Sequence, residues 1–190
     1  MNKHIIYMAA GNSRRFGSNK LLHIYNGKPL YRHGLEMLME FCSHRSDCSL
    51  LVVSQYEEIL QQAKLFGISS VYSADSKQGM SYTIKAALHA LGNIPEEDFI
   101  VFVVADQPYM SEKTMEKILE QARSGVETVS AAYHEKPGNP TMFSARLIPE
   151  LLKLKEDEGG RRVIKNHKCV YVEVKDETEL YDIDVPGELI

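Results

Sequence analysis

The sequence predicts an α/β protein in which helices cover both faces of a mostly parallel, Rossmann-like sheet, giving a three-layer α/β/α sandwich. Two observations lead to this prediction. Short runs that are almost wholly apolar, such as residues 4–10 and 99–105, are typical of parallel strands buried on both faces. Segments with helical periodicity alternate with these runs along the chain, as expected for successive βαβ units.

Length and composition favour one domain spanning residues 1–190. The formal net charge of −4 argues against non-specific nucleic-acid binding, which favours a clearly basic domain. No apolar run is long enough to span a membrane, and the first strand lacks the charged leader and cleavage site of a signal peptide. The three cysteines lack a C-x-x-C spacing, so we expect reduced thiols in a cytoplasmic protein.

In the first half of the chain, apolar runs predict the strands and amphipathic spacing predicts the helices. Leu35, Leu38 and Met39 lie on one side of the first helix, and Gly67 is a suitable stop for the second. The expected elements are a strand at 4–10, a turn at 26–29, a helix at 30–41, a strand at 49–53, a helix at 56–66 and a short strand at 70–72.

In the second half, Gly79 opens a segment whose apolar residues recur at helical spacing, and Ser111 is a candidate N-cap. The prolines of Pro137-Gly138-Asn139-Pro140 predict a turn. The expected elements are a helix from 79 to 91, a strand at 99–105, a helix at 114–123, a strand at 128–133, the turn at 137–140, a helix at 145–154, a short helix after Gly160 and a strand at 169–174.

The loop that follows the first strand, MAAGNSRRFGSNK, combines glycines with cations. Gly11 and Gly17 would let the backbone approach an anion closely, while Arg15 and Lys20 would supply donors and charge to a phosphate. The spacing fits neither a Walker loop nor a dinucleotide fingerprint. We therefore expect a phosphate-binding loop of another kind.

Asp106 follows the apolar run 99–105 directly, so it would lie at the carboxyl end of a central strand, where open α/β sheets bind ligands. Because crossover connections are right-handed, the first loop should open at the same end of the sheet. We therefore expect Arg15, Lys20 and Asp106 to share one cleft.

A magnesium ion would suit such a cleft, since Mg²⁺ takes one or two carboxylates and fills its other positions with water and substrate phosphate oxygens. Asp106 is the first candidate ligand. By residue type, Asp182 and Asp184 near the end of the chain are candidates for the second.

Residues 9–22 resemble, position by position, the A-A-G-x-S-x-R-[MF]-G-x-x-K-L-L signature of MobA-like nucleotidyltransferases, and most of all the molybdenum cofactor cytidylyltransferase branch. The resemblance implies a fold of the nucleotide-diphospho-sugar transferase type. It also places Asp106 in the metal-binding G-D-Q-P motif of the family and Asp184 in its D-I-D-[TV]-P ending. The nucleotide-binding residues that it implies are Ala9, Ala10, Gly11, Ser13, Gly17, Gly79, Ser81 and Thr83.

The activity that the resemblance implies is a Mg²⁺-dependent transfer of CMP from CTP to the phosphate of molybdopterin, with release of pyrophosphate. Arg15, Lys20 and Asp106 would be catalytic, and A-A-G at residues 9–11 resembles the cytidylyl branch, whereas A-G-G accompanies guanylyl transfer. A molybdoenzyme or its insertion chaperone would be the protein partner. Gln107, Asn139 and Arg161 are the candidate residues for binding the acceptor.

Other functions stay open at this point. The chain has Gly138-Asn139-Pro140 where cytidylyl members commonly have G-H-P, so the acceptor could differ. The enzyme could use GTP or UTP, or a sugar or alditol phosphate as acceptor. A non-catalytic nucleotide-binding regulator would keep the same loop without turnover.

Overall fold

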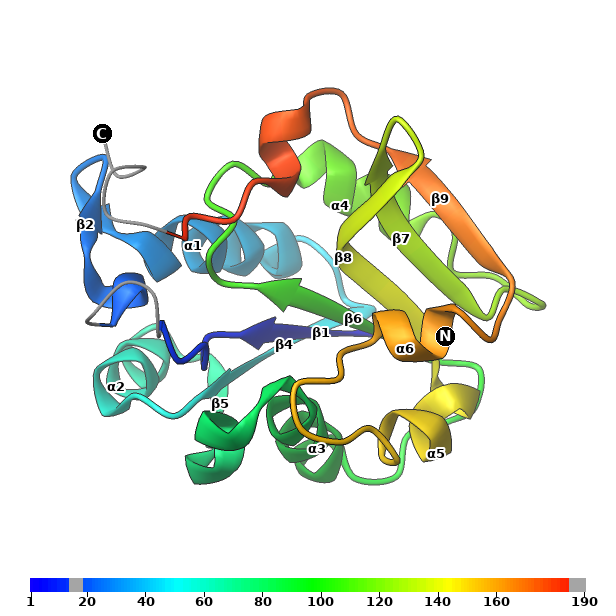
Figure 1. The fold of residues 1–190 in the computed structure, drawn as a ribbon, viewed down its shortest axis with the longest axis horizontal. Helices are drawn as coiled ribbons and strands as arrows, with labels where there is room; N and C mark the ends of the chain where they lie inside the picture. Colours follow the sequence, from blue (N-terminus) through cyan, green and yellow to red (C-terminus); the bar gives the residue numbers. More distant parts are fainter. Residues whose placement is uncertain (14–18, 185–190) are drawn as a thin grey trace.

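The structure is a computed structural model that describes residues 1–13 and 19–184. A seven-stranded sheet runs through its centre, with helices on both faces (Figure 1). In spatial order the strands are β5 (Ser69–Tyr72), β4 (Cys48–Ser54), β1 (Lys3–Met8), β6 (Phe99–Val104), β8 (Lys136–Ser144), β7 (Thr128–Tyr133) and β9 (Cys169–Glu173). The α-helices are α1 (Leu30–Ser43), α2 (Glu57–Leu65), α3 (Met80–Leu91), α4 (Glu112–Leu119), α5 (Ile148–Leu151) and α6 (Arg161–Ile164).

The predicted three-layer, mostly parallel architecture is confirmed. Among the described strands of this sheet, β8 alone runs opposite to its neighbours, pairing antiparallel with both β6 and β7. The pairs that flank β1 are parallel in uninterrupted register from Lys3 to Met8. The carboxyl ends of β1 and β6 therefore lie side by side, and the loops that follow them open at the same end of the sheet.

Alternation along β1 explains why the sheet needs helices on both faces. Ile5 and Tyr7 belong to one core cluster and Ile6 and Met8 to the other, because successive strand residues point to opposite faces. Helices α1, α2 and α4 contribute their apolar sides to the first cluster, and α3, α5 and α6 to the second. In Figure 1, α1 and α4 lie above the sheet, while α3 and α5 lie below it.

The segment 136–144 differs from the prediction of a turn followed by a helix, because it forms β8. The prolines are accommodated where the β7–β8 register shifts, between Ser130 and Ala132, and proline lacks the N–H that regular pairing needs. Ser130 Oγ donates to the carbonyl of Gly138 at 2.9 Å within this irregular stretch.

Two further boundaries differ from the predictions. Ser111 is the N-cap that we expected, accepting from Thr114 N at 3.2 Å, but the helix covers Glu112–Leu119 and ends before residue 123. The predicted helix at 145–154 is a 3₁₀ turn, Ala145–Leu147, followed by α5.

The predicted turn at 26–29 is confirmed as the tip of a small hairpin of β2 (Ile24–Tyr25) and β3 (Lys28–Pro29). Asn26 and Gly27 occupy its two central positions with φ values of 44° and 84°, as a type I′ turn requires. Within residues 1–13 and 19–184, no helix is both long and apolar enough to cross a lipid bilayer.

One contact fixes how α1 sits on the sheet. Tyr7 is fully buried on β1, and its hydroxyl donates to the carbonyl of Tyr31 on α1 at 2.6 Å. The ring lies over Gly34, where an added Cβ would come within 2.8 Å of the hydroxyl oxygen and 3.0 Å of a ring carbon. Glycine in the middle of this helix is therefore required by packing.

We expect Gly34→Ala to lower the free energy of unfolding by about 1–3 kcal/mol, because the added methyl must displace the Tyr7 ring. Helix propensity alone would give the opposite sign, since alanine is favoured over glycine by about 1 kcal/mol inside a helix. Urea unfolding followed by circular dichroism measures the change. The double variant Tyr7→Phe/Gly34→Ala should recover part of the loss, and a stabilised Gly34→Ala would contradict the packing argument.

Candidate functional site

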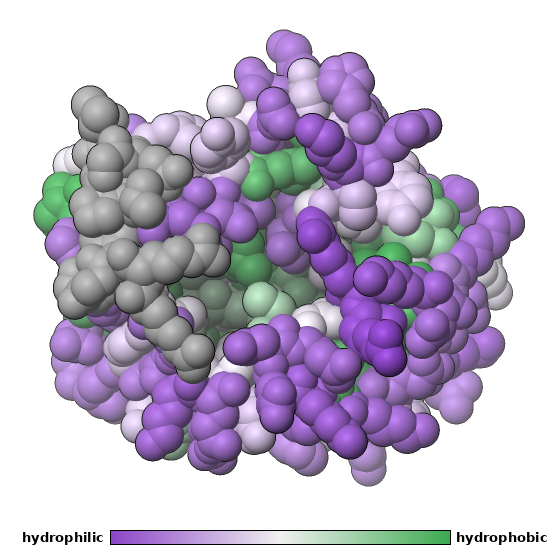
Figure 2. All heavy atoms as spheres, in the orientation of Figure 1, coloured by the Kyte–Doolittle hydropathy of each residue, from purple (hydrophilic) through white to green (hydrophobic). Residues whose placement is uncertain are grey.

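A cavity of ≈ 180 Å³ opens at the carboxyl ends of β1 and β6. Figure 2 shows a hollow on this face whose floor is apolar and whose rim is mostly hydrophilic. Apolar side chains from both strands contribute to the lining, together with the first loop, the start of α3 and the α5–α6 connection. The lining residues are Met8, Ala10, Gly11, Asn12, Lys20, Leu21, Ser76, Gly79, Met80, Thr83, Val104, Ala105, Asp106 and Asp157.

The first loop leaves the sheet with its backbone held by three consecutive side chains. The carbonyls of residues 9–11 each accept a hydrogen bond from the segment 54–56, which begins with the last residue of β4. The donors are Ser54 Oγ to Ala9 O, Gln55 Nε2 to Ala10 O and the Tyr56 hydroxyl to Gly11 O, each at 2.7 Å. This network sets the direction in which the loop enters the cavity.

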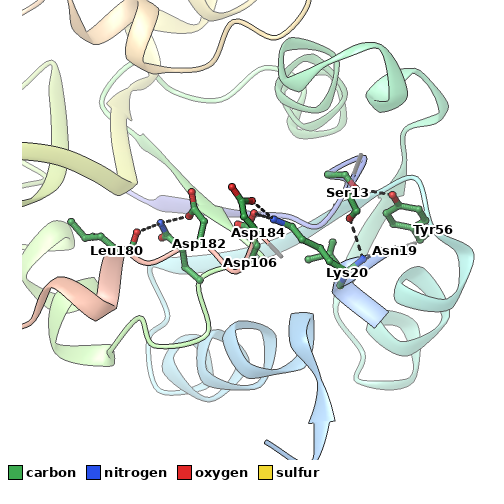
Figure 3. Close-up of polar contacts among 11 residues, drawn as sticks. Ser13, Asn19, Lys20, Tyr56, Asp106, Leu180, Asp182 and Asp184 are labelled. Carbon is green, nitrogen blue, oxygen red and sulfur yellow. Dashed lines mark hydrogen bonds and ion pairs between the residues drawn. The ribbon is translucent and has the colours of Figure 1, made fainter. Parts of the chain in front are cut away.

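Lys20 lies between two carboxylates from distant parts of the chain. Its Nζ is 2.8 Å from Asp106 Oδ2, at the end of β6, and 3.0 Å from Asp184 Oδ1, near the end of the described chain. Figure 3 shows the three side chains pointing toward one another. Although Lys20 is 6% exposed, its charge is balanced by partners on two sides.

The charges around Lys20 alter the acidity of nearby groups. Burial opposes the ammonium form of Lys20, but the charges and hydrogen bonds of Asp106 and Asp184 outweigh it and raise the pKa. Desolvation raises the pKa of Asp182, and the neighbouring carboxylate of Asp106 raises it further. Negative charge thus accumulates at this end of the sheet.

The donor set of the site fits a divalent cation. Two carboxylates that already share one positive charge can share another, and Mg²⁺ needs one or two such ligands besides water and substrate phosphate. Within the described part of the chain, no group of three His, Cys, Asp or Glu residues is placed to hold a metal by itself. Asp106 and Asp184 would therefore depend on substrate oxygens to complete the coordination.

The connection between α5 and α6 passes close to the backbone at the start of α3. Gly79 has φ 145°, and a Cβ there would lie 2.3 Å from the carbonyl oxygen of Glu156. The same carbonyl accepts from Ser81 N at 3.0 Å. Because Gly79 has no side chain, the connection can approach this closely, and both Gly79 and Asp157 line the cavity.

The structure brings together part of the predicted nucleotide-binding set. A neighbouring cavity, also lined by Lys20, Asp106 and Asp184, takes in Ser13, whose Oγ accepts from Lys20 N at 3.1 Å. Ala10, Gly11, Gly79 and Thr83 line the main cavity, whereas Ala9 and Ser81 are buried and line neither. Arg15 and Gly17 lie outside the described residues.

The three candidate acceptor residues line neither of these two cavities. Gln107 is 4% exposed and donates to Asp182 Oδ1 and to the carbonyl of Leu180. Arg161 donates to the carbonyl of Pro137, which ties α6 to the start of β8. Asn139 lies beside that contact on β8.

Sequence reasoning missed Asp157 and the segment 54–56. Asp157 stands two residues before the Gly159-Gly160 break, and a carboxylate beside a predicted glycine loop was the available signal. The side chains of 54–56 follow a predicted strand at the same end of the sheet as Lys20. Nothing in their residue types identified them as partners of backbone carbonyls.

Comparison with known proteins gives one family over most of the chain. The domain described as "MobA-like NTP transferase domain" matches residues 5–170. The purine catabolism protein PucB of Bacillus subtilis is 30% identical, over 96% of this chain and 92% of that protein.

Two solved structures share the fold at lower identity. A nucleotidyl transferase from Methanothermobacter superposes with a TM-score of 0.80 at 18% identity, covering 98% of this chain and 94% of that one. A manganese complex of Rv0371c from Mycobacterium tuberculosis gives 0.73 at 20% identity, covering 92% and 89%.

We expect Gly79→Ala to lower the free energy of unfolding by about 1–3 kcal/mol and to weaken nucleotide binding, because the methyl must push the carbonyl of Glu156 away and move Asp157 with it. Urea unfolding and calorimetric nucleotide titration measure the two effects. Gly11→Ala is the matched control for stability, since no atom lies within 4 Å of the added Cβ. Equal unfolding free energies for the two variants would contradict this role of Gly79.

We expect Lys20→Met to lower the free energy of unfolding at pH 7 by about 2 kcal/mol, because two carboxylates lose their shared cation. Since the folded-state pKa of Lys20 is raised, its contribution is complete below the unfolded value of about 10.4 and is lost as pH rises through the folded value. The difference in the free energy of unfolding between wild type and variant should therefore stay constant as the pH rises from neutral and should disappear only in strong alkali. Lys113→Met, an exposed lysine on α4, should show no such difference.

Proposed function

Because the chain belongs to the MobA-like NTP transferase family and is a nucleotidyltransferase, we propose that it transfers CMP from CTP to the phosphate of a molybdopterin-type acceptor and releases pyrophosphate. Residues 1–190 would act as one domain in this reaction. The observation that carries the proposal is that Lys20 Nζ lies 2.8 Å from Asp106 and 3.0 Å from Asp184, beside a cavity with an apolar floor. A base suits such a floor, and a triphosphate suits the charged mouth.

The reaction is an in-line displacement. A phosphate oxygen of the acceptor attacks the α-phosphorus of CTP, a new P–O bond forms, and the bond to the β-phosphate oxygen breaks with that electron pair leaving on pyrophosphate. The acceptor phosphate is already ionised, so no general base is needed. Catalysis then consists of holding the two anionic groups together and neutralising the charge on the leaving group.

Arg15, Lys20 and Asp106 are the catalytic residues in this proposal. Lys20 would supply a compact ammonium, charged at neutral pH, which contacts the triphosphate and stabilises the departing pyrophosphate. Arg15 would add a bidentate donor to the same group. The segment 54–56 orients the backbone of residues 9–11 for close approach to the nucleotide.

Asp106 and Asp184 are the proposed ligands of a divalent metal, which we take to be Mg²⁺. When bound, the ion neutralises phosphate charge and acts as a Lewis acid on the α-phosphate. Nucleotidyltransferases of this type typically use a divalent metal, and the manganese complex of the related fold agrees with such a site. Asp106 and Asp184 would hold the ion, and Lys20, which lies between these two carboxylates, would keep its positive charge beside the phosphates.

The nucleotide would lie against the end of β1 and the start of α3. Ala9, Ala10 and Gly11 carry the A-A-G pattern of the cytidylyl branch, which is the reason for choosing CTP. Ser13, Gly17, Gly79, Ser81 and Thr83 are the other proposed nucleotide-binding residues. Thr83 Oγ1 donates to Ser76 Oγ at 2.8 Å at the cavity wall, which gives the base a polar partner.

For the acceptor we propose Asn139 and Arg161, which lie on adjoining elements beyond the cavity. Gln107 is also proposed as an acceptor-side residue, because its amide group holds the segment 180–182 through hydrogen bonds to Leu180 and Asp182. The relative PucB is named for purine catabolism, so a molybdoenzyme of purine catabolism, or the chaperone that inserts its cofactor, is the proposed partner.

We expect CTP with Mg²⁺ to raise the melting temperature more than GTP, UTP or ATP, and pyrophosphate release to require the pterin acceptor. Asp106→Asn should lower the rate of pyrophosphate release by about 10²–10³-fold, because one metal ligand and the counter-charge of Lys20 are lost together. Glu112→Gln, an exposed carboxylate at the start of α4, should keep the wild-type rate. Preferential stabilisation by GTP or UTP, or turnover with a sugar phosphate in place of the pterin, would replace CTP or the acceptor in this proposal.

A further inference from the structure

We propose that Glu179 and Gln107 are positioning residues that hold Asp184 beside Asp106. Neither side chain lines the cavities, yet both tie the segment 179–184 to the loop that follows β6. This segment is called the C-terminal strap below. The inference rests on the proposed function, because it assigns a purpose to the strap only if Asp184 helps to bind the metal.

Glu179 is the first tie. It is 8% exposed, and its Oε2 accepts from the Ser111 hydroxyl at 2.6 Å, from Ser111 N at 3.2 Å and from the Thr114 hydroxyl at 2.6 Å. Ser111 is the N-cap of α4, where the helix dipole favours an anion. A buried charge with three donors and a helix N-terminus is fully compensated, so Glu179 fixes the start of the strap.

Gln107 and the backbone of Asp106 make the next ties. Gln107 Nε2 donates to Leu180 O at 3.1 Å and to Asp182 Oδ1 at 2.8 Å, and Ile183 N donates to Asp106 O at 3.0 Å. The Ile183 side chain is 2% exposed in the core. Contacts at residues 179, 180, 182 and 183 leave the strap little freedom before Asp184.

These contacts fix the position of Asp184, the last residue of the strap, beside Lys20. In Figure 3, Leu180 and Asp182 lie to one side of Asp106 and Asp184, which lie together and face Lys20. Asp184 is 41% exposed at its side chain, so burial alone does not hold it. Its place beside Asp106 depends on the earlier ties, and residues that orient metal ligands typically affect metal affinity about 10–100-fold.

The experiment measures Mn²⁺ binding to the protein saturated with CTP, without acceptor, by electron paramagnetic resonance, because the proposed site needs phosphate oxygens to complete the coordination. We expect Glu179→Ala and Gln107→Leu to raise the dissociation constant about 10–100-fold and Asp184→Ala to raise it at least as much. Glu177→Ala is the matched control, because Glu177 is an exposed carboxylate on the same 3₁₀ turn, Glu177–Leu180. It should bind Mn²⁺ as the wild type does.

A second measurement needs no metal. Hydrogen exchange of the Ile183 amide, which donates to Asp106 O, should be faster in Glu179→Ala than in the wild type, while amides of β1 should be unchanged. Glu179→Gln keeps an acceptor oxygen for the two hydroxyls and should show an intermediate effect in both measurements. It carries the test if Glu179→Ala does not fold.

The outcomes separate the two proposals. If Mn²⁺ binding requires Asp106 but is unchanged in Glu179→Gln and Gln107→Leu, the positioning role is wrong and the metal site stands. If Mn²⁺ binding is the same in Asp106→Asn as in the wild type, the metal site of the proposed function is wrong, and the positioning role fails with it. Lower stability in Glu179→Ala with unchanged exchange at Ile183 would also overturn the positioning role.

Discussion

The ammonium of Lys20, shared between Asp106 and Asp184, is the interaction on which the site depends. It joins the first loop, the end of β6 and the C-terminal strap, which are far apart in sequence, at one point. Two carboxylates attract the one ammonium from two sides, and the negative charge that they share makes this the natural position for a second cation. The cavity beside it contributes the apolar floor, and the loop carbonyls held by 54–56 contribute the direction of approach.

Two acids at the opposite ends of β6 lie in different surroundings. Asp98 precedes β6 at the opposite end of the sheet, with its side chain 1% exposed, and accepts from Asn2 N at 2.6 Å while also contacting His4. Burial opposes ionisation of Asp98, but these partners outweigh it and lower the pKa. Asp98 therefore has its partners within the fold, whereas Asp106 shares one lysine with a second acid at a cavity mouth.

Much of the fold follows from local pattern, and part of the site follows from topology. The apolar runs of β1 and β6 predicted two parallel strands whose following loops open at the same end of the sheet, which led to the expectation that Lys20 and Asp106 share a cleft. That the two strands are direct neighbours is seen only in the structure. The strand β8 was missed because prolines argue against a strand unless a register shift accommodates them. The contacts made by Glu179 and Gln107, and the position of Asp157, could not be predicted. They depend on packing between segments that are far apart in the sequence, and no local sequence pattern indicates such packing. Whether Arg15 joins the cleft stays a prediction.

The three carbonyls of residues 9–11 also bear on how this chain can vary. Successive carbonyls accept from successive side chains: residue 9 from residue 54, residue 10 from residue 55 and residue 11 from residue 56. Replacing one donor would free one carbonyl. Inserting or deleting one residue directly after β4 would leave Ser54 in place but mismatch Gln55 and Tyr56 together, so this connection should keep its length in descendants of the sequence even where its side chains change.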